Sequence, residues 1–286
     1  MVGWIYIILC VLSSILIAHF FKVTEQQKLS TLRVITVNYL IAFPTAFLIY
    51  ERQERTHTFS SDLIFPMFLA VFVGIIFIYN FFVYSKSVDQ NGLGISVAAM
   101  RVSLIIPVLL STLWYLELLT WVQWIGLILV FVVLYLLLPN KESLFDRNTS
   151  SGWMLPVLFI MTGIGDASLK VYEREFSELL SKGEFMGIVF FTAFLIGIST
   201  VIIKREWNFT KKEFLIGACV GIPNLLAATF LIEALERMNG AIVFSAVNVL
   251  TVLGGTLVGV VFWKDRFTKL QWTGILLTII SILLLF

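Results

Sequence analysis

The sequence predicts an all-α integral membrane protein with ten transmembrane helices, arranged as two inverted five-helix repeats. Composition, the length of the apolar runs and an internal repeat lead to this prediction. Of the 286 residues, 59% are hydrophobic and only 13% are charged, with a mean hydropathy of +0.97. Soluble domains average roughly 45–50% apolar and about 25% charged residues. Too few charged side chains are present to cover a water-exposed surface, so lipid must surround most of the chain.

The apolar runs account for the predicted helices. A helix needs about 20 mostly apolar residues to cross a hydrocarbon core of about 30 Å. The first run has no basic segment before it and further spans follow it, so it reads as a membrane helix rather than a signal peptide. The connections are too short to hold a soluble catalytic domain. Ten segments qualify: 4–21, 31–50, 64–84, 92–114, 121–138, 153–170, 184–203, 212–233, 240–263 and 270–286.

An internal repeat divides the chain into two units. Offset by 148 residues, the segment 119–138 aligns with 267–286. Matches between leucines carry little information in a membrane protein, so the other matches are the evidence for the repeat. These are Thr120/Thr268, Gln123/Gln271, Trp124/Trp272, Gly126/Gly274, the acidic pair Glu117/Asp265 and Asn91-Gly92/Asn239-Gly240. Near the start of each unit, an offset of 149 aligns Gly3-Trp4 with Gly152-Trp153. We therefore predict two units, 1–140 and 150–286.

The number of helices in each unit indicates a mechanism. Because five is odd, the second unit must cross the membrane in the opposite sense to the first. Inverted repeats of this kind underlie alternating access in many secondary transporters. The expected function is therefore secondary transport of a small metabolite, amino-acid-like or drug-like compound.

The repeated block resembles the EamA family of the drug/metabolite transporter superfamily. In each half a helix opens with Asn-Gly, a short acidic turn follows, and a QW..G helix ends the unit, as in Glu117 to Gly126 and Asp265 to Gly274. The resemblance covers essentially the whole chain. It implies ten helices, a central cavity lined by spans one to four and six to nine, and peripheral fifth and tenth spans.

Arg101 is the first candidate for a substrate-binding residue. It lies about ten residues into segment 92–114, near the middle of a bilayer. An ionisable group at that depth costs roughly 2.5–3.5 kcal/mol on insertion scales and is a functional hypothesis by default. A guanidinium there suits a carboxylate, a phosphate or another anionic or polar group. The alternative is a structural arginine bonded to the carbonyls of a neighbouring helix.

Asp166 and Lys170 form the second candidate, for ion coupling or an ion pair. They stand one helical turn apart in segment 153–170, with the acid before the base, which is the favourable order for an i,i+4 pair. A protonatable Asp166 suits proton coupling. An Asp166 bound to Lys170 at the membrane interface does not, and the sequence leaves both readings open.

Four asparagines within the predicted membrane helices are further candidates for substrate binding. Two prolines mark positions where the hydrogen bonding of a helix is expected to be interrupted. Pro107 follows Arg101, and Pro223 precedes one of the asparagines. Gly255 and Gly259 have GxxxG spacing, which predicts close helix packing. The asparagines are Asn38, Asn80, Asn224 and Asn248.

The remaining classes of function have less support. No phosphate-binding loop is visible, so gradients or exchange must supply the energy, and no cofactor or metal is expected. An intramembrane enzyme lacks an HExxH cluster and a convincing Ser/His pair. A channel-like permease lacks a ring of like charges. The expected partners are the bilayer, a small-molecule substrate and a coupling proton or exchanged solute. A net charge of +2 gives no reason to expect a nucleic acid.

The expected location is the cytoplasmic membrane, but two indications of orientation disagree. Loops on the side of the N-terminus hold six Lys and Arg residues, and loops on the other side hold thirteen. The positive-inside rule then places the termini outside. The family resemblance implies termini inside, and the sequence leaves this open.

Overall fold

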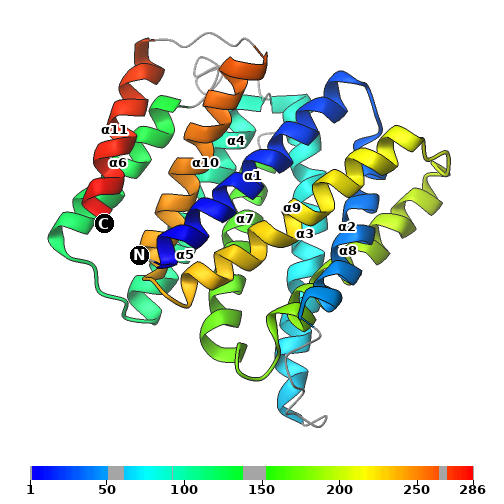
Figure 1. Ribbon diagram of the computed structural model, residues 1–286, viewed down its shortest axis with the longest axis horizontal. Helices are drawn as coiled ribbons and strands as arrows, with labels where there is room; N and C mark the ends of the chain where they lie inside the picture. The colour runs from blue at the N-terminus through cyan, green and yellow to red at the C-terminus, as the bar shows by residue number, and fades with distance from the viewer. Residues whose placement is uncertain (1, 51–60, 92, 138–152, 264–268, 286) are drawn as a thin grey trace.

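A computed structural model describes residues 2–50, 61–91, 93–137, 153–263 and 269–285. All the regular elements within these ranges are helical (Figure 1). The first half of the chain forms α1 (Val2–Gln26), α2 (Thr31–Tyr50), η1 (Ser61–Leu63), α3 (Ile64–Asn91), α4 (Leu93–Val102), α5 (Ile105–Leu109), η2 (Leu110–Trp114) and α6 (Trp121–Leu137). The second half forms α7 (Met154–Val171), η4 (Tyr172–Phe176), α8 (Lys182–Ile203), α9 (Lys211–Leu235), α10 (Gly240–Trp263) and α11 (Lys269–Leu285).

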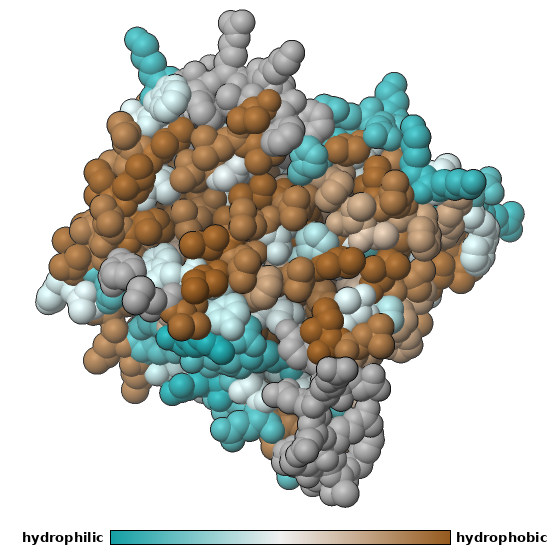
Figure 2. Space-filling model, in the orientation of Figure 1, coloured by the Kyte–Doolittle hydropathy of each residue, from teal (hydrophilic) through white to brown (hydrophobic). Residues whose placement is uncertain are grey.

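The structure establishes a multi-pass helical membrane protein. Seven of the described helices are long and apolar enough to cross a bilayer, fewer than the ten predicted. Three further apolar helices are shorter, and they cover 99–114, 121–136 and 272–285. Figure 2 shows apolar residues over the broad middle of the molecule, with hydrophilic residues gathered at its upper right and lower left. This distribution is typical of a bundle that meets water only at its two ends.

The two sequence units are interleaved and do not form separate lobes. α1 and α2 pack against α8, α9 and α10, whereas they barely touch one another. In the same way, α7 packs against α3, α4 and α5 of the first unit. Most of the apolar core therefore lies between helices from different halves.

The helices α6 and α11 stand apart from this core. They pack against one another along their length, and α10 is the main helix that both of them touch (Figure 1). A Cβ atom at Gly126 of α6 would press on Leu284 and Leu285 of α11. Both helices keep many exposed apolar side chains, as lipid-facing helices do.

The two ends of the bundle are distinguished by their contacts. At the terminal end, which holds both chain termini, the Arg237 guanidinium stacks on the Tyr6 ring with 4.6 Å to its centroid. Gly3 lies beside Met238 there, and a Cβ atom at Gly3 would collide with that side chain. The opposite end holds the loop between α1 and α2 and the start of α9.

Glu213 organises the opposite end. It closes a capping box with Thr210 at the start of α9, which satisfies backbone donors that a helix start leaves free. The same carboxylate accepts two hydrogen bonds from the Arg33 guanidinium, at 3.0 and 2.7 Å, and one from the Ser30 N–H at 3.0 Å. Because its side chain is only 1% exposed, these partners offset the cost of burying its charge.

This network yields a stability prediction. Glu184 of α8 also closes a capping box, with Ser181, but holds no arginine. Glu184→Ala should therefore lose about 1 kcal/mol, the usual value of a cap. Glu213→Ala should lose more, roughly 2–3 kcal/mol, because it also removes the charge-assisted hydrogen bonds to the partly exposed Arg33. Thermal unfolding of the two purified variants tests this, and equal losses of stability would contradict the role given to Glu213.

Candidate functional site

A polar stripe runs along α7 through the middle of the bundle. Thr162, Asp166 and Lys170 follow one another at intervals of four residues, so they lie on one helical face. Each step rises about 6 Å along the helix axis. Each of the three side chains has a polar or charged partner from another part of the chain, and together they define the candidate site.

The helix that carries Arg101 is broken immediately after it. Segment 92–114 was predicted as one helix, but α4 ends at Val102 and α5 begins at Ile105. Pro107 explains the break, because it has no N–H to donate to the Ser103 carbonyl. Instead that carbonyl accepts from the Ile106 N–H at 3.0 Å, in a tighter turn. Discontinuous helices of this kind line the substrate sites of many transporters.

Arg101 lies between α10 and α7 at this break. Its guanidinium donates a hydrogen bond to Asn248 Oδ1 at 3.1 Å, and the Asn248 amide donates to the Phe244 carbonyl at 2.9 Å. The guanidinium also interacts electrostatically with Asp166 of α7 and Tyr84 of α3. Arg101 and Asp166 are both half-buried. The structure thus brings a cation and an anion from different halves of the chain into one neighbourhood.

Two hydroxyl groups flank Asn248 on the same helix. Ser245 and Thr251 lie three residues before and after it, within about one-third of the helix circumference. Both are buried, and neither hydroxyl has a hydrogen-bond partner in the described part of the chain. An unpaired buried hydroxyl carries a desolvation cost of about 1–3 kcal/mol.

Asn80 lies one turn from Tyr84 on α3 and pairs with the α7 stripe. Its amide donates to Thr162 Oγ1 at 3.0 Å, and the Thr162 hydroxyl lies 3.3 Å from Asn80 Oδ1. Asn80 therefore ties α3 to α7 next to the charged pair. Asn80 borders the Arg101 neighbourhood, and its amide is already engaged.

Lys170 does not pair with Asp166, in contrast to one of the two readings of the sequence. Its ammonium lies 2.7 Å from Glu117 Oε1 and 2.8 Å from Glu173 Oε2. Glu173 reaches it because α7 continues into the π-helical turn η4. Glu117 comes from the turn that follows η2. With two carboxylates beside it, Lys170 is satisfied without Asp166, although its side chain is only 1% exposed.

Glu117 also caps the helix that carries Asn248. Its second oxygen accepts from the Gly240 N–H at 2.7 Å, and its backbone carbonyl accepts from the Asn239 amide at 3.0 Å. A negative charge at a helix N-terminus is favourable because the free N–H groups and the helix dipole both face it. A Cβ atom at Gly240 would collide with the Ser111 hydroxyl, so glycine permits this close approach. We call Glu117, Lys170, Glu173 and Gly240 the terminal cluster.

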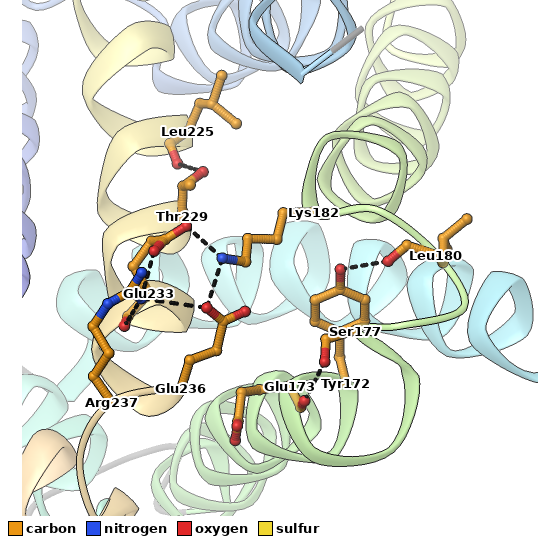
Figure 3. Close-up of polar contacts among 10 residues, drawn as sticks. All are labelled: Tyr172, Glu173, Ser177, Leu180, Lys182, Leu225, Thr229, Glu233, Glu236 and Arg237. Carbon is orange, nitrogen blue, oxygen red and sulfur yellow. Dashed lines mark hydrogen bonds and ion pairs between the residues drawn. The ribbon is translucent and has the colours of Figure 1, made fainter. Parts of the chain in front are cut away.

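A second group of charges closes the rim of the terminal end. Lys182, at the start of α8, forms ion pairs with Glu233 and Glu236 near the end of α9 (Figure 3). Arg237 also bonds Glu233, at 2.6 Å. Beside them, the Tyr172 hydroxyl donates to the Leu180 carbonyl at 2.7 Å (Figure 3). Together these contacts tie α7, α8, α9 and α1 at this end.

Asn38 and Asn224 lie apart from the stripe. The Asn224 amide donates to Asn38 Oδ1 at 3.2 Å, which links α2 to α9. Asn38 is buried at 2% exposure. The pair therefore satisfies itself across two helices from different halves, and it does not join the Arg101 neighbourhood.

Close helix packing is predicted at Gly255, and the structure shows it at the neighbouring Gly254. No described atom lies within 4 Å of a Cβ atom built at Gly255, whereas one built at Gly254 would collide with Ile15 of α1. Helix phase explains the shift, because α1 approaches the face that carries Gly254. Among the described residues, close packing is therefore seen at Gly254, and close packing at Gly255 and Gly259 remains a prediction.

Sequence reasoning missed the partners that complete the site. Tyr84, Thr162 and Glu173 were not among the candidates, and Glu117 was noted only as part of the repeat. The signal for Glu117 was present, because an acidic residue and an Asn-Gly helix start recur together in both units. Such a pair suggests a carboxylate that caps a helix distant in sequence.

The fold and the buried charges are those of a multi-pass membrane protein. The model of the EamA-like transporter family matches the chain twice, at residues 1–138 and 154–286. The chain belongs to this family. It is 24% identical to an uncharacterized protein of Haemophilus influenzae, over 98% of this chain and 97% of that protein. A crystal structure of another protein matches with a TM-score of 0.77 at 11% identity, over 98% and 97% of the two chains, which shows a shared fold.

The Asn38–Asn224 bond gives a second prediction. In a double-mutant cycle of Asn38→Ala, Asn224→Ala and both together, we expect a coupling energy of about 0.6 kcal/mol, the average for interhelical hydrogen bonds in membranes. Reversible unfolding in mixed detergent micelles measures it. Asn38→Ala with Asn80→Ala serves as the uncoupled control. Coupling no larger than this control would mean that the bond contributes nothing.

Proposed function

We propose that this transporter is a secondary carrier that moves a small anionic or amphoteric metabolite across the cytoplasmic membrane by alternating access. The ten predicted spans, in two inverted units over 1–140 and 150–286, would provide the two related conformations. The internal repeat and the two separate matches to the family model support this architecture. The broken helices α4, α5 and η2 count as one span in this proposal.

The observation that carries the proposal is the pairing of charges at the break in this span. Arg101 has one neutral partner, Asn248, and one carboxylate in its electrostatic neighbourhood, Asp166. A purely structural arginine would have its donors filled by carbonyls, whereas Arg101 has five donors and, among the described residues, one hydrogen bond, to Asn248. In the proposed function, other donors of Arg101 bind an anionic group of the substrate.

Asp166 gives the site its second charge and its possible coupling. Since Lys170 is bound to Glu117 and Glu173, Asp166 is left to Arg101 and to the substrate. An amphoteric molecule would place its anionic group on Arg101 and its cationic group near Asp166. A proton could occupy Asp166 in place of the cationic group, which would couple transport to a proton gradient.

Two alternatives remain distinguishable by experiment. A channel-like permease would conduct without saturation or exchange, and the ion pairs that close the terminal end argue against an open pore. An intramembrane enzyme would convert its substrate, and the described partners of Arg101, which are Asn248, Asp166 and Tyr84, do not form a nucleophile–base pair. Saturable counterflow in proteoliposomes identifies a carrier, and product formation identifies an enzyme.

The first test is binding to the Arg101 site. In a thermal-shift screen of the purified protein against anionic, cationic and amphoteric metabolites, compounds with an anionic group should raise the unfolding temperature. Arg101→Ala should weaken such binding by about 10–100-fold, since a lost charge-assisted hydrogen bond costs about 1.5–3 kcal/mol. Arg101→Lys should retain part of the affinity, because it keeps the charge but loses the planar guanidinium.

The matched control is Arg33→Ala, which removes a guanidinium from the opposite end. It should lower stability but leave the dissociation constant unchanged. The proposal fails if Arg101→Ala binds the same compounds with wild-type affinity. Asp166→Asn separates the two roles of the carboxylate. Loss of amphoteric but not anionic ligands indicates a contact with the substrate, and loss of uphill transport with unchanged binding indicates proton coupling.

A further inference from the structure

The charges of the terminal cluster recur in the other half of the sequence. At the same offset of 148 residues, Lys170-Val171-x-Glu173 aligns with Lys22-Val23-x-Glu25. This is the offset that pairs Glu117 with Asp265 and Gly240 with Gly92. All four members of the terminal cluster therefore have a counterpart of the same chemical type: Lys22, Glu25, Asp265 and Gly92. Charged residues make up only 13% of the chain, so apolar composition does not account for the matches.

The terminal cluster joins three parts of the chain. Lys170 and Glu173 belong to α7 and its continuation η4, Glu117 lies in the turn after η2 of the first half, and Gly240 begins α10. The Tyr115 ring lies over the ammonium, with 6.0 Å to its centroid. Because Lys170 is almost fully buried, moving Glu117 away would leave its charge with one carboxylate in an apolar setting. The cluster therefore holds the end of the Arg101 span, which consists of α4, α5 and η2, against α7 and α10.

The counterpart lysine and glutamate are in a different condition. Lys22 is half-buried and Glu25 is exposed, both near the end of α1 at the opposite end of the bundle. Neither side chain takes part in an ion pair or hydrogen bond within the described ranges. Glu25 interacts electrostatically with Tyr84, which also interacts with Arg101. Asp265 and Gly92 lie outside the described residues.

We propose that Lys170 and Lys22 anchor two alternating latches, one at each end of the Arg101 site. This inference rests on the proposed carrier function and assigns its gating residues. In the conformation described, Lys170 is buried between Glu117 and Glu173, and the terminal end is closed. In the other conformation, Lys22 is buried beside Glu25 and the opposite end is closed.

The two latches compete because the halves are interleaved. The helices of the Arg101 span and α10 each run from one end of the bundle toward the other. When these helices close together with their neighbours at one end, they move apart from their neighbours at the other end. Neutralising one lysine should therefore shift the equilibrium toward the conformation that the other lysine stabilises. Opposite effects of two like substitutions are the signature of this arrangement.

Accessibility of a single cysteine at Ser245 measures this equilibrium. Ser245 is fully buried and lies on α10 between Gly240 at the terminal end and Asn248 beside Arg101. The reporter chain carries Ser245→Cys with Cys10→Ala and Cys219→Ala, which remove the two native thiols. The purified protein in lipid nanodiscs, where both ends meet water, is treated with a charged maleimide.

In this reporter, Lys170→Met should speed alkylation by about tenfold or more, because the terminal latch loses its cation. Lys22→Met should slow alkylation by about threefold, because the competing conformation is weakened. The double variant should return toward the rate of the reporter alone. The control is Lys212→Met, which neutralises an exposed lysine of α9 at the opposite end and should change nothing.

The proposal is overturned if both lysine variants change the rate in the same direction, or if Lys22→Met has no effect. Should Lys170→Met fail to fold, Lys22→Met carries the test, since the half-buried Lys22 has no ion pair or hydrogen bond with the described residues. The assay needs no substrate. Failure of the latches would therefore leave the ligand-binding test at Arg101 unaffected, and loss of binding in Arg101→Ala would leave the latches unaffected.

Discussion

The Lys170 ammonium is almost completely shielded from solvent, and the terminal end of the molecule is arranged around it. Two carboxylates compensate its charge, one from the next turn of its own helix and one from 53 positions earlier in the chain. The earlier one, Glu117, uses its other oxygen to cap α10. Removing a charge from water is costly unless hydrogen-bonded partners surround it. This one requirement therefore fixes the end of the Arg101 span, the position of η4 and the start of the helix that carries Asn248.

The same requirement explains why Lys170 does not pair with Asp166. A helix that places acid and base four residues apart would normally pair them. Here the base is already committed elsewhere, and the acid faces a guanidinium from the other half. The described interior thus contains the terminal cluster, in which Lys170 has two carboxylates, and the Arg101–Asp166 neighbourhood, about one turn away along α7. The proposed function assigns solute binding to the second of these.

Much of the fold could be predicted from the sequence, because apolar runs of about 20 residues are a strong signal in lipid. Each predicted segment contains helix in the structure, and the repeat matches the two regions recognised by the family model. Local rules failed where distant residues decide the outcome. The partner of Lys170 could not be read from its own helix, and Gly254 rather than Gly255 meets α1 because phase depends on packing. Pro107 was noted as a source of loosening, but the break itself depends on where the Ser103 carbonyl finds a donor.

The interleaving of the two halves has a consequence for biogenesis. α1 and α2 find their main neighbours in α8, α9 and α10, and α3 and α4 find theirs largely in α7 and α8. During synthesis, Arg101 and Asn38 of the first half therefore lack their partners Asn248 and Asn224 until the second half has been made. Neither half has a complete interior of its own. The chain reaches its native arrangement only after its last helices have entered the membrane, and a nascent chain arrested midway would present its polar groups to lipid or to the insertion machinery.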